Sequence, residues 1–279
     1  MRLTFRLLLC VHLLGQAFLC AAASEGPPSL DQGYRFMYSF DFHAAEQEFA
    51  RWNQEHPDDP LAPVSGAANL LFSELERLGI LEVHFLADNS SFTSRVKPSA
   101  DLDLRTRFNA ALDQAETMAR RHLARDADDR DALFALTLVY GLRADYAALI
   151  EKRNMASLRY TRQASEWASK LLAIAPDYYD AYLASGASEY IVGSLGAPVR
   201  WMMRAAGYSG NKTKGIQELT LTAERGRFLA PFARILLATA YLRERDTTQA
   251  RQLLVGLRKD FPSNPLFARE IGRIDSLKN

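Results

Sequence analysis

PFARILLATAYLRERDTTQARQLLVGLRKDFP, residues 231–262, carries the spacing that decides the fold. Ala250 follows Ala238 by twelve residues, Leu254 follows Ala250 by four, and Pro262 follows Ala250 by twelve. Small residues at such intervals let two antiparallel helices cross closely, and the proline ends the second helix. The same three intervals occur near the start of the chain, at Gly33, Ala45, Phe49 and Pro57. The pattern predicts repeated helix–turn–helix units.

This spacing resembles the tetratricopeptide repeat (TPR), a helix–turn–helix unit of about 34 residues. In that unit the turn proline precedes the next small residue by ten positions, so Pro176 predicts Gly186 and Pro262 predicts Gly272, and both are present. The resemblance implies a right-handed α-solenoid of about five helix pairs. A closing helix, Leu266–Leu277, would present a polar outer face, made of Arg269, Glu270, Arg273 and Asp275.

Between these units the helical period continues, and no segment alternates as a strand would. We therefore expect an all-α protein of eleven or twelve helices. Two insertions interrupt the repeats, Asp88–Asp101 and Gly193–Gly210, and the second contains a short helix, Val199–Ala206. Longer helices are predicted over Leu61–Ala87, Leu102–Arg125, Asp131–Ile150, Met155–Ile174 and Thr213–Gly226.

The second half carries a further resemblance, to a divergent TPR group that includes eukaryotic outer-membrane and inclusion-body-clearance proteins and exported bacterial proteins. That group implies an interaction role and no catalytic residue. The residues that carry it run in order: Tyr182, Gly186, Arg200-Trp201-Met202, Gly207, Gly210-Asn211-Lys212, Gly215-Ile216, Leu219, Pro231-Phe232-Ala233, and Pro262 with Asn264-Pro265-Leu266-Phe267.

The first 23 residues are typical of a secretory signal peptide: a basic start, an apolar run from Leu7 to Leu19, and small residues ending at Ala23. Residues 24–29 would form a flexible lead-in and residues 30–279 a single domain. Without the leader the chain has no cysteine, and 32 Lys and Arg balance 33 Asp and Glu. We expect a periplasmic or secreted protein that binds no nucleic acid and has no membrane span after signal removal. An uncleaved anchor, or a lipid on Cys20, would instead tether it.

Motifs for catalysis and cofactors are incomplete, which favours a protein that is no enzyme and holds no metal or cofactor. The segment Gly207–Thr213 has Asn211 where a phosphate loop needs glycine, so Asn211 reads as a helix cap. The aspartates of 126–131 lack the glycine and glutamate of a calcium loop and read as a helix N-terminus. No two of the histidines at 43, 56, 84 and 122 have metal-ligand spacing, and each is expected on a helix surface or at a helix end.

The resemblance to TPR proteins also implies a partner-binding concave face lined by particular positions of the first helix of each pair. Rigid aromatics and arginine suit a peptide-binding surface, although the tyrosines could instead pack between helices with their hydroxyls at the rim. The implied residues are Tyr34, Met37, Tyr38, Tyr140, Leu183, Tyr190, Thr239 and Arg243.

These observations predict a scaffold that binds a protein or peptide segment on its concave face. The alternative is a carrier or sensor of an apolar small molecule or lipid. In that case the 193–210 insertion, with Trp201, Met202, Met203 and Tyr208, would close a cavity.

Overall fold

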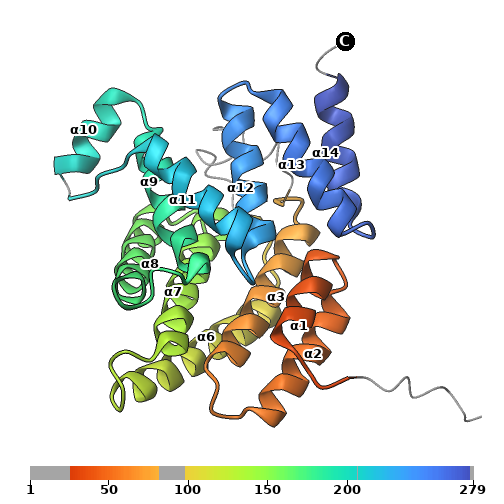
Figure 1. The fold of residues 1–279 in the computed structure, drawn as a ribbon, viewed down its shortest axis with the longest axis vertical. Coiled ribbons are helices and arrows are strands. Elements are labelled where there is room, and N and C mark those ends of the chain that lie inside the picture. Colours follow the sequence, from red (N-terminus) through yellow and green to blue (C-terminus); the bar gives the residue numbers. More distant parts are fainter. Residues whose placement is uncertain (1–25, 82–97, 206, 277–279) are drawn as a thin grey trace, which may run out of the picture.

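The structure, a computed structural model, describes residues 26–81, 98–205 and 207–276. In these residues the chain is entirely helical and contains no strand (Figure 1). The predicted leader, His84 and most of the first insertion lie outside the described residues. The α-helices are α1 (Leu30–Tyr38), α2 (Phe42–Glu55), α3 (Leu61–Arg77), α6 (Leu102–Leu123), α7 (Arg130–Asp145), α8 (Asn154–Ile174), α9 (Tyr182–Gly193), α10 (Ala197–Ala205), α11 (Lys212–Arg225), α12 (Ala230–Arg243), α13 (Thr247–Asp260) and α14 (Pro265–Ser276).

Each described helix packs on the next described helix, with one exception. The helix α9 packs mainly on α11, and α10, which comes between them in the sequence, makes only a small contact with α9. A π-helical turn, Tyr146–Ile150, extends α7. By length and composition alone Arg130–Ile150 could cross a membrane, but 72% of its apolar window is buried inside the protein. This segment therefore serves as a core helix of the fold.

Among the small residues of the repeated spacing, Gly33 and Gly186 lie where helices cross closely, as predicted, whereas Gly272 is exposed with nothing within 4 Å of an added Cβ. Ala45 and Ala250 are fully buried. A Cβ atom on Gly33 would overlap the ring of Phe49, so only glycine fits the crossing of α1 and α2.

The turns of the two pairs also match. Phe40 and Arg245 both have φ of 63°, and the aspartate after each caps the next helix. Asp41 accepts from the N–H of Ala44 and Asp246 from that of Gln249, which satisfies free amides of the first turn.

The first helices pack against the last turns of the chain. The rings of Tyr34 and Phe228 stack with centroids 5.0 Å apart, and those of Tyr38 and Phe261 lie 5.7 Å apart. The two ends of the fold are therefore in contact, and the space between them is filled by aromatic side chains.

Two predictions were wrong, one of a helix boundary and one of a polar helix face. The helix expected to run to Ala87 ends at Arg77, because Gly79 adopts a left-handed φ of 70° and its neighbour's N–H turns back to Leu75. In α14 the expected polar face is not wholly outward: Glu270 is 1% exposed, and Arg273 donates a 2.8 Å bond to its carboxylate.

Candidate functional site

Most residues expected on a concave binding face are buried. Leu183 and Arg243 are half-buried. The aromatic contacts between the two ends of the fold cover Tyr34 and Tyr38. The expectation of one continuous exposed surface was wrong for the six buried residues, which are Tyr34, Met37, Tyr38, Tyr140, Tyr190 and Thr239.

The tyrosine hydroxyls of the later helices are also engaged. Tyr190 donates to the backbone carbonyl of Ala240 at 3.3 Å. Tyr140 donates to Glu116 at 2.7 Å and accepts from Arg120 at 2.8 Å. Although burial opposes it, the bonds from Tyr140, Arg143 and Arg120 lower the pKa of Glu116 to about 2. These tyrosines act as packing residues with their hydroxyls tied to the framework.

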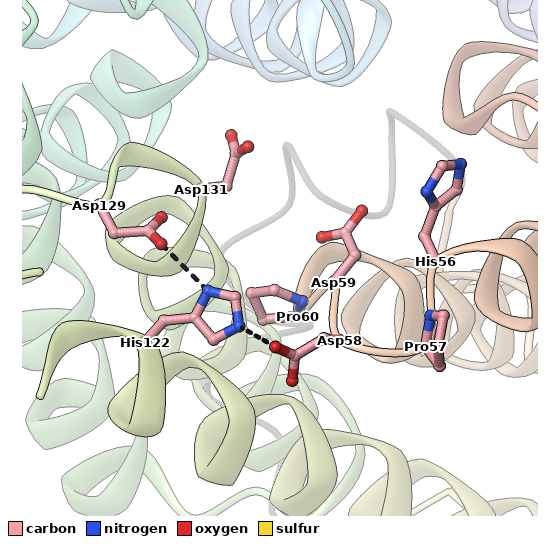
Figure 2. A pocket seen from close by; sticks show the side chains of 8 residues that line it. All are labelled: His56, Pro57, Asp58, Asp59, Pro60, His122, Asp129 and Asp131. Carbon is pink, nitrogen blue, oxygen red and sulfur yellow. Dashed lines mark hydrogen bonds and ion pairs between the residues drawn. The ribbon is translucent and has the colours of Figure 1, made fainter. Parts of the chain in front are cut away.

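The residues that the structure does bring together line an acidic hollow between residues 56–60, which follow α2, and residues 122–131, which run from the end of α6 into the start of α7 (Figure 2). It is an open depression of about 370 Å³. Its lining combines four carboxylates, two imidazoles and two prolines: His56, Pro57, Asp58, Asp59, Pro60, His122, Asp129 and Asp131.

Local helix-capping chemistry fixes two of these carboxylates. Asp129 is the N-cap of α7 and accepts from the N–H of Ala132 at 2.9 Å, while its other oxygen lies 3.0 Å from Nδ1 of His122. Asp59 accepts from the N–H of Leu61 at 2.8 Å and from the Trp52 indole at 2.7 Å. Each side chain is therefore held in place with one face toward the hollow.

Asp58 lies at the outer edge and has basic neighbours. Nε2 of His122 is 3.2 Å from its carboxylate, a contact that becomes an ion pair when the imidazole is protonated. Arg121 and Arg125 lie 3.6 and 3.7 Å away. Because these side chains are exposed to solvent and the distances are long, the arginines stabilise the charge of Asp58 only weakly.

Asp131 experiences a surplus of negative charge. Burial raises the pKa of its carboxyl, and the charges of Asp59 and Asp129 raise the pKa further, while Arg227 partly opposes them. A positive group entering the hollow would relieve this repulsion. Among the described residues no group of three or more potential ligands has an arrangement suited to a metal ion.

Sequence reasoning placed His56 and His122 on helix surfaces or at helix ends and the 126–131 aspartates at a helix N-terminus. Both histidines lie at helix ends, and Asp129 and Asp131 lie at the N-terminus of α7, while Asp126 and Asp128 lie in the turn before it. Sequence reasoning did not bring these residues together, because the hollow joins turns more than sixty residues apart. The one available signal was that aspartates cluster in both turns.

The helix of the second insertion, α10, buries none of its side chains, and Trp201 and Met202 are exposed. Asn211 caps α11 as predicted, accepting from the N–H of Lys214 at 3.1 Å.

No protein-family model matches the chain, and no curated protein is significantly similar to it.

Proposed function

We propose that this chain is an exported, non-enzymatic TPR-like scaffold that binds a protein segment, and that the acidic hollow receives a basic side chain of that segment. The repeat assignment rests on the shared geometry of the first and last pairs. Both have a fully buried alanine in the second helix, a left-handed residue in the turn and an aspartate cap. Proteins built from such repeats usually act by binding other proteins.

The observation that carries the site assignment is the gathering of carboxylates around one depression. Three carboxylates, those of Asp59, Asp129 and Asp131, face one depression, and a lysine or arginine side chain would compensate them. Guanidinium is the better match, because its planar fork can bond two carboxylates at once. The binding surface would then lie at the inter-helix turns rather than on the filled concave side.

The test uses hexa-arginine and hexa-glutamate peptides with nuclear magnetic resonance detection. Trp52 is a local reporter, since its indole N–H is bonded to Asp59. We expect hexa-arginine to shift this indole signal in a saturable manner and hexa-glutamate to leave it unchanged. Asp131→Asn should weaken the binding about tenfold, equivalent to roughly 1.4 kcal/mol.

The matched control is Asp103→Asn, which removes one exposed carboxylate from α6 outside the hollow. It removes one negative charge from the protein, as Asp131→Asn does, and should leave the affinity unchanged. Equal weakening by both variants would mean that the peptide responds to overall charge, and the hollow would no longer be the site.

A further inference from the structure

The chain carries an apolar projection that the proposed function does not use. We call residues 194–209, which contain α10, the arm; it projects from the body beside α9 and α11 (Figure 1). Among the described residues, seven large hydrophobic side chains are exposed, and three of them lie on the arm. A fourth, Ile191, lies at its base on α9. The three on the arm are Val199, Trp201 and Met202, with exposed fractions of 46, 71 and 62%.

The base of the arm is held rigidly. Gly193 and Gly210 face each other across it, and a Cβ on Gly210 would lie 2.5 Å from the backbone nitrogen of Gly193. A Cβ on Gly193 would overlap the backbone at Lys212, and one on Gly215 would overlap Tyr190. The arm therefore leaves and rejoins the body through a backbone-to-backbone contact that admits no side chain.

Hydrogen bonds set the direction in which α10 faces. Arg200 donates to the carbonyls of Gly193 and Leu195 at 3.2 and 3.3 Å, so this side of α10 is turned to the base. Met203, three residues along on the same side, is half-buried. Trp201 and Met202 point away from that side, because successive helical residues are rotated by about 100°. The apolar face is thus presented outward in a fixed orientation.

The charge of this region is entirely positive. Between Glu189 and Glu218 the sequence has four basic residues and no acidic one, in a chain whose charges otherwise nearly balance. Lys212 and Lys214, at the base, form ion pairs with Glu244 and Glu189. On the arm itself Arg204 is exposed, one turn from Trp201. The outward surface therefore combines an aromatic ring, aliphatic side chains and a cation.

We propose that the arm docks on an anionic phospholipid surface, with Trp201 and Met202 entering the interface and Arg204 lying among the phosphates. Tryptophan and a basic polar edge are the composition of helices that lie in a membrane interface. The convex shape also favours lipid, because acyl chains and headgroups can close around a projecting helix of nine residues. A protein interface of ordinary size buries about 800 Å² per partner and requires a broader surface. A single basic residue near an anionic surface strengthens the attachment only about fivefold, so the attachment is reversible.

This inference goes beyond the proposed function and involves a different surface. The experiment measures partitioning of the purified full chain onto vesicles of phosphatidylcholine alone and of phosphatidylcholine with 30% phosphatidylglycerol (roughly the composition that gives a strongly negative surface). We expect at least about tenfold stronger partitioning onto the anionic vesicles, weakened by salt. The double variant Trp201→Ala with Met202→Ala should lower it about tenfold, and Arg204→Gln about fivefold on anionic vesicles only.

Two comparisons keep the result specific to the arm. Leu102→Ala removes an equally exposed apolar side chain from α6 and should leave partitioning unchanged. Binding through residues 1–25 would persist in the double variant. Only the difference in partitioning between the wild type and the double variant therefore reports on the arm. Circular dichroism would verify that each variant keeps its helices.

Equal partitioning of the wild type and the double variant would overturn the proposal, and so would equal binding to both kinds of vesicle. Arm-dependent self-association in sedimentation, without vesicle binding, would also overturn it and assign the arm to a second copy of the chain. Asp131→Asn should leave vesicle binding intact, so a failure of the acidic hollow as a site and a failure of the arm are distinguishable.

Discussion

The side-chain amide of Asn264 donates a 2.8 Å hydrogen bond to the backbone carbonyl of Tyr38, 226 residues earlier in the chain. The oxygen of the same amide accepts from the N–H of Leu266 at 2.9 Å and starts α14. Asn264 is 2% exposed. One side chain therefore caps the last helix and ties the last turn to the end of the first helix.

We expect Asn264→Ala to lower the free energy of unfolding by about 2–3 kcal/mol, because it leaves a buried carbonyl and a helix N-terminus without partners. Urea denaturation followed by circular dichroism measures the change. Ser263→Ala is the control, since the exposed Ser263 hydroxyl has only a 3.4 Å contact with Ser39. A loss at Asn264 no greater than that at Ser263 would contradict the importance of this closure.

Ala250→Leu should destabilise the fold by about 1–3 kcal/mol, because Ala250 is fully buried and a larger side chain must displace a neighbouring helix. Ala45→Leu should behave alike, since Ala45 occupies the matching place in the first pair. Ala110→Leu places the same side chain on the exposed face of α6 and should change the melting temperature little. Unchanged melting of the Ala250 variant would show that the close helix crossing is not required.

Gly215→Ala should destabilise the fold, because the added Cβ would overlap the backbone of Tyr190. This loss should exceed the gain in helix propensity that alanine brings over glycine. We expect a loss of about 2 kcal/mol or more and a loosened arm. Gly66→Ala in α3 provides the opposite case: nothing lies within 4 Å of the added atom, so it should stabilise by about 0.5–1 kcal/mol. Thermal melting of the two variants should therefore shift in opposite directions.

Asp145 should make the stability depend on pH. Burial at the end of α7 raises the pKa of its carboxyl to about 7, against an ordinary value near 3.9 in the unfolded chain. Between these values the folded protein binds more protons than the unfolded chain, so this residue's contribution to stability falls as pH rises from about 4 to about 7. The loss would be on the order of 1–3 kcal/mol.

Asp145→Asn should remove this dependence and raise the unfolding midpoint in urea at pH 8 while changing it little at pH 4. Asp103→Asn, on the exposed side of α6, should leave the pH profile as in the wild type. The test subtracts the stability of Asp145→Asn from that of the wild type at each pH. If this difference does not fall between about pH 4 and about pH 7, Asp145 is not the source of the pH dependence.

Much of the fold could be predicted because its determinants are local. The apolar periodicity predicts the ends of α6, α7 and α8 to within a few residues. Asn211 and Asp129 cap the helices that follow them through their own side chains, which is also a local signal. The end of α3 was missed although Gly79 marks it, because the apolar stripe continues past the glycine and periodicity alone does not register the backbone reversal.

The binding residues were harder to predict, because their exposure depends on distant segments. Tyr34 and Tyr38 read as surface aromatics in an open array, yet Phe228 and Phe261 cover them. Spacing within a repeat says nothing about whether the first and last repeats meet. The acidic hollow has the same origin, since His56 and His122 come to line one hollow only through the packing of α2, α3 and α6.

The contact between Asp31 on α1 and Arg227 before α12, together with the stacked rings of Tyr34 and Phe228, has a kinetic consequence. Chains in which each helix pair touches only its neighbours unravel from their ends, and they fold from any point outward. Here each end shields the other, and the pairing needs residues almost two hundred positions apart to meet. Such distant contacts slow the search for the native state. They also couple the two ends, so neither terminal pair can open without exposing the aromatic side chains of the other.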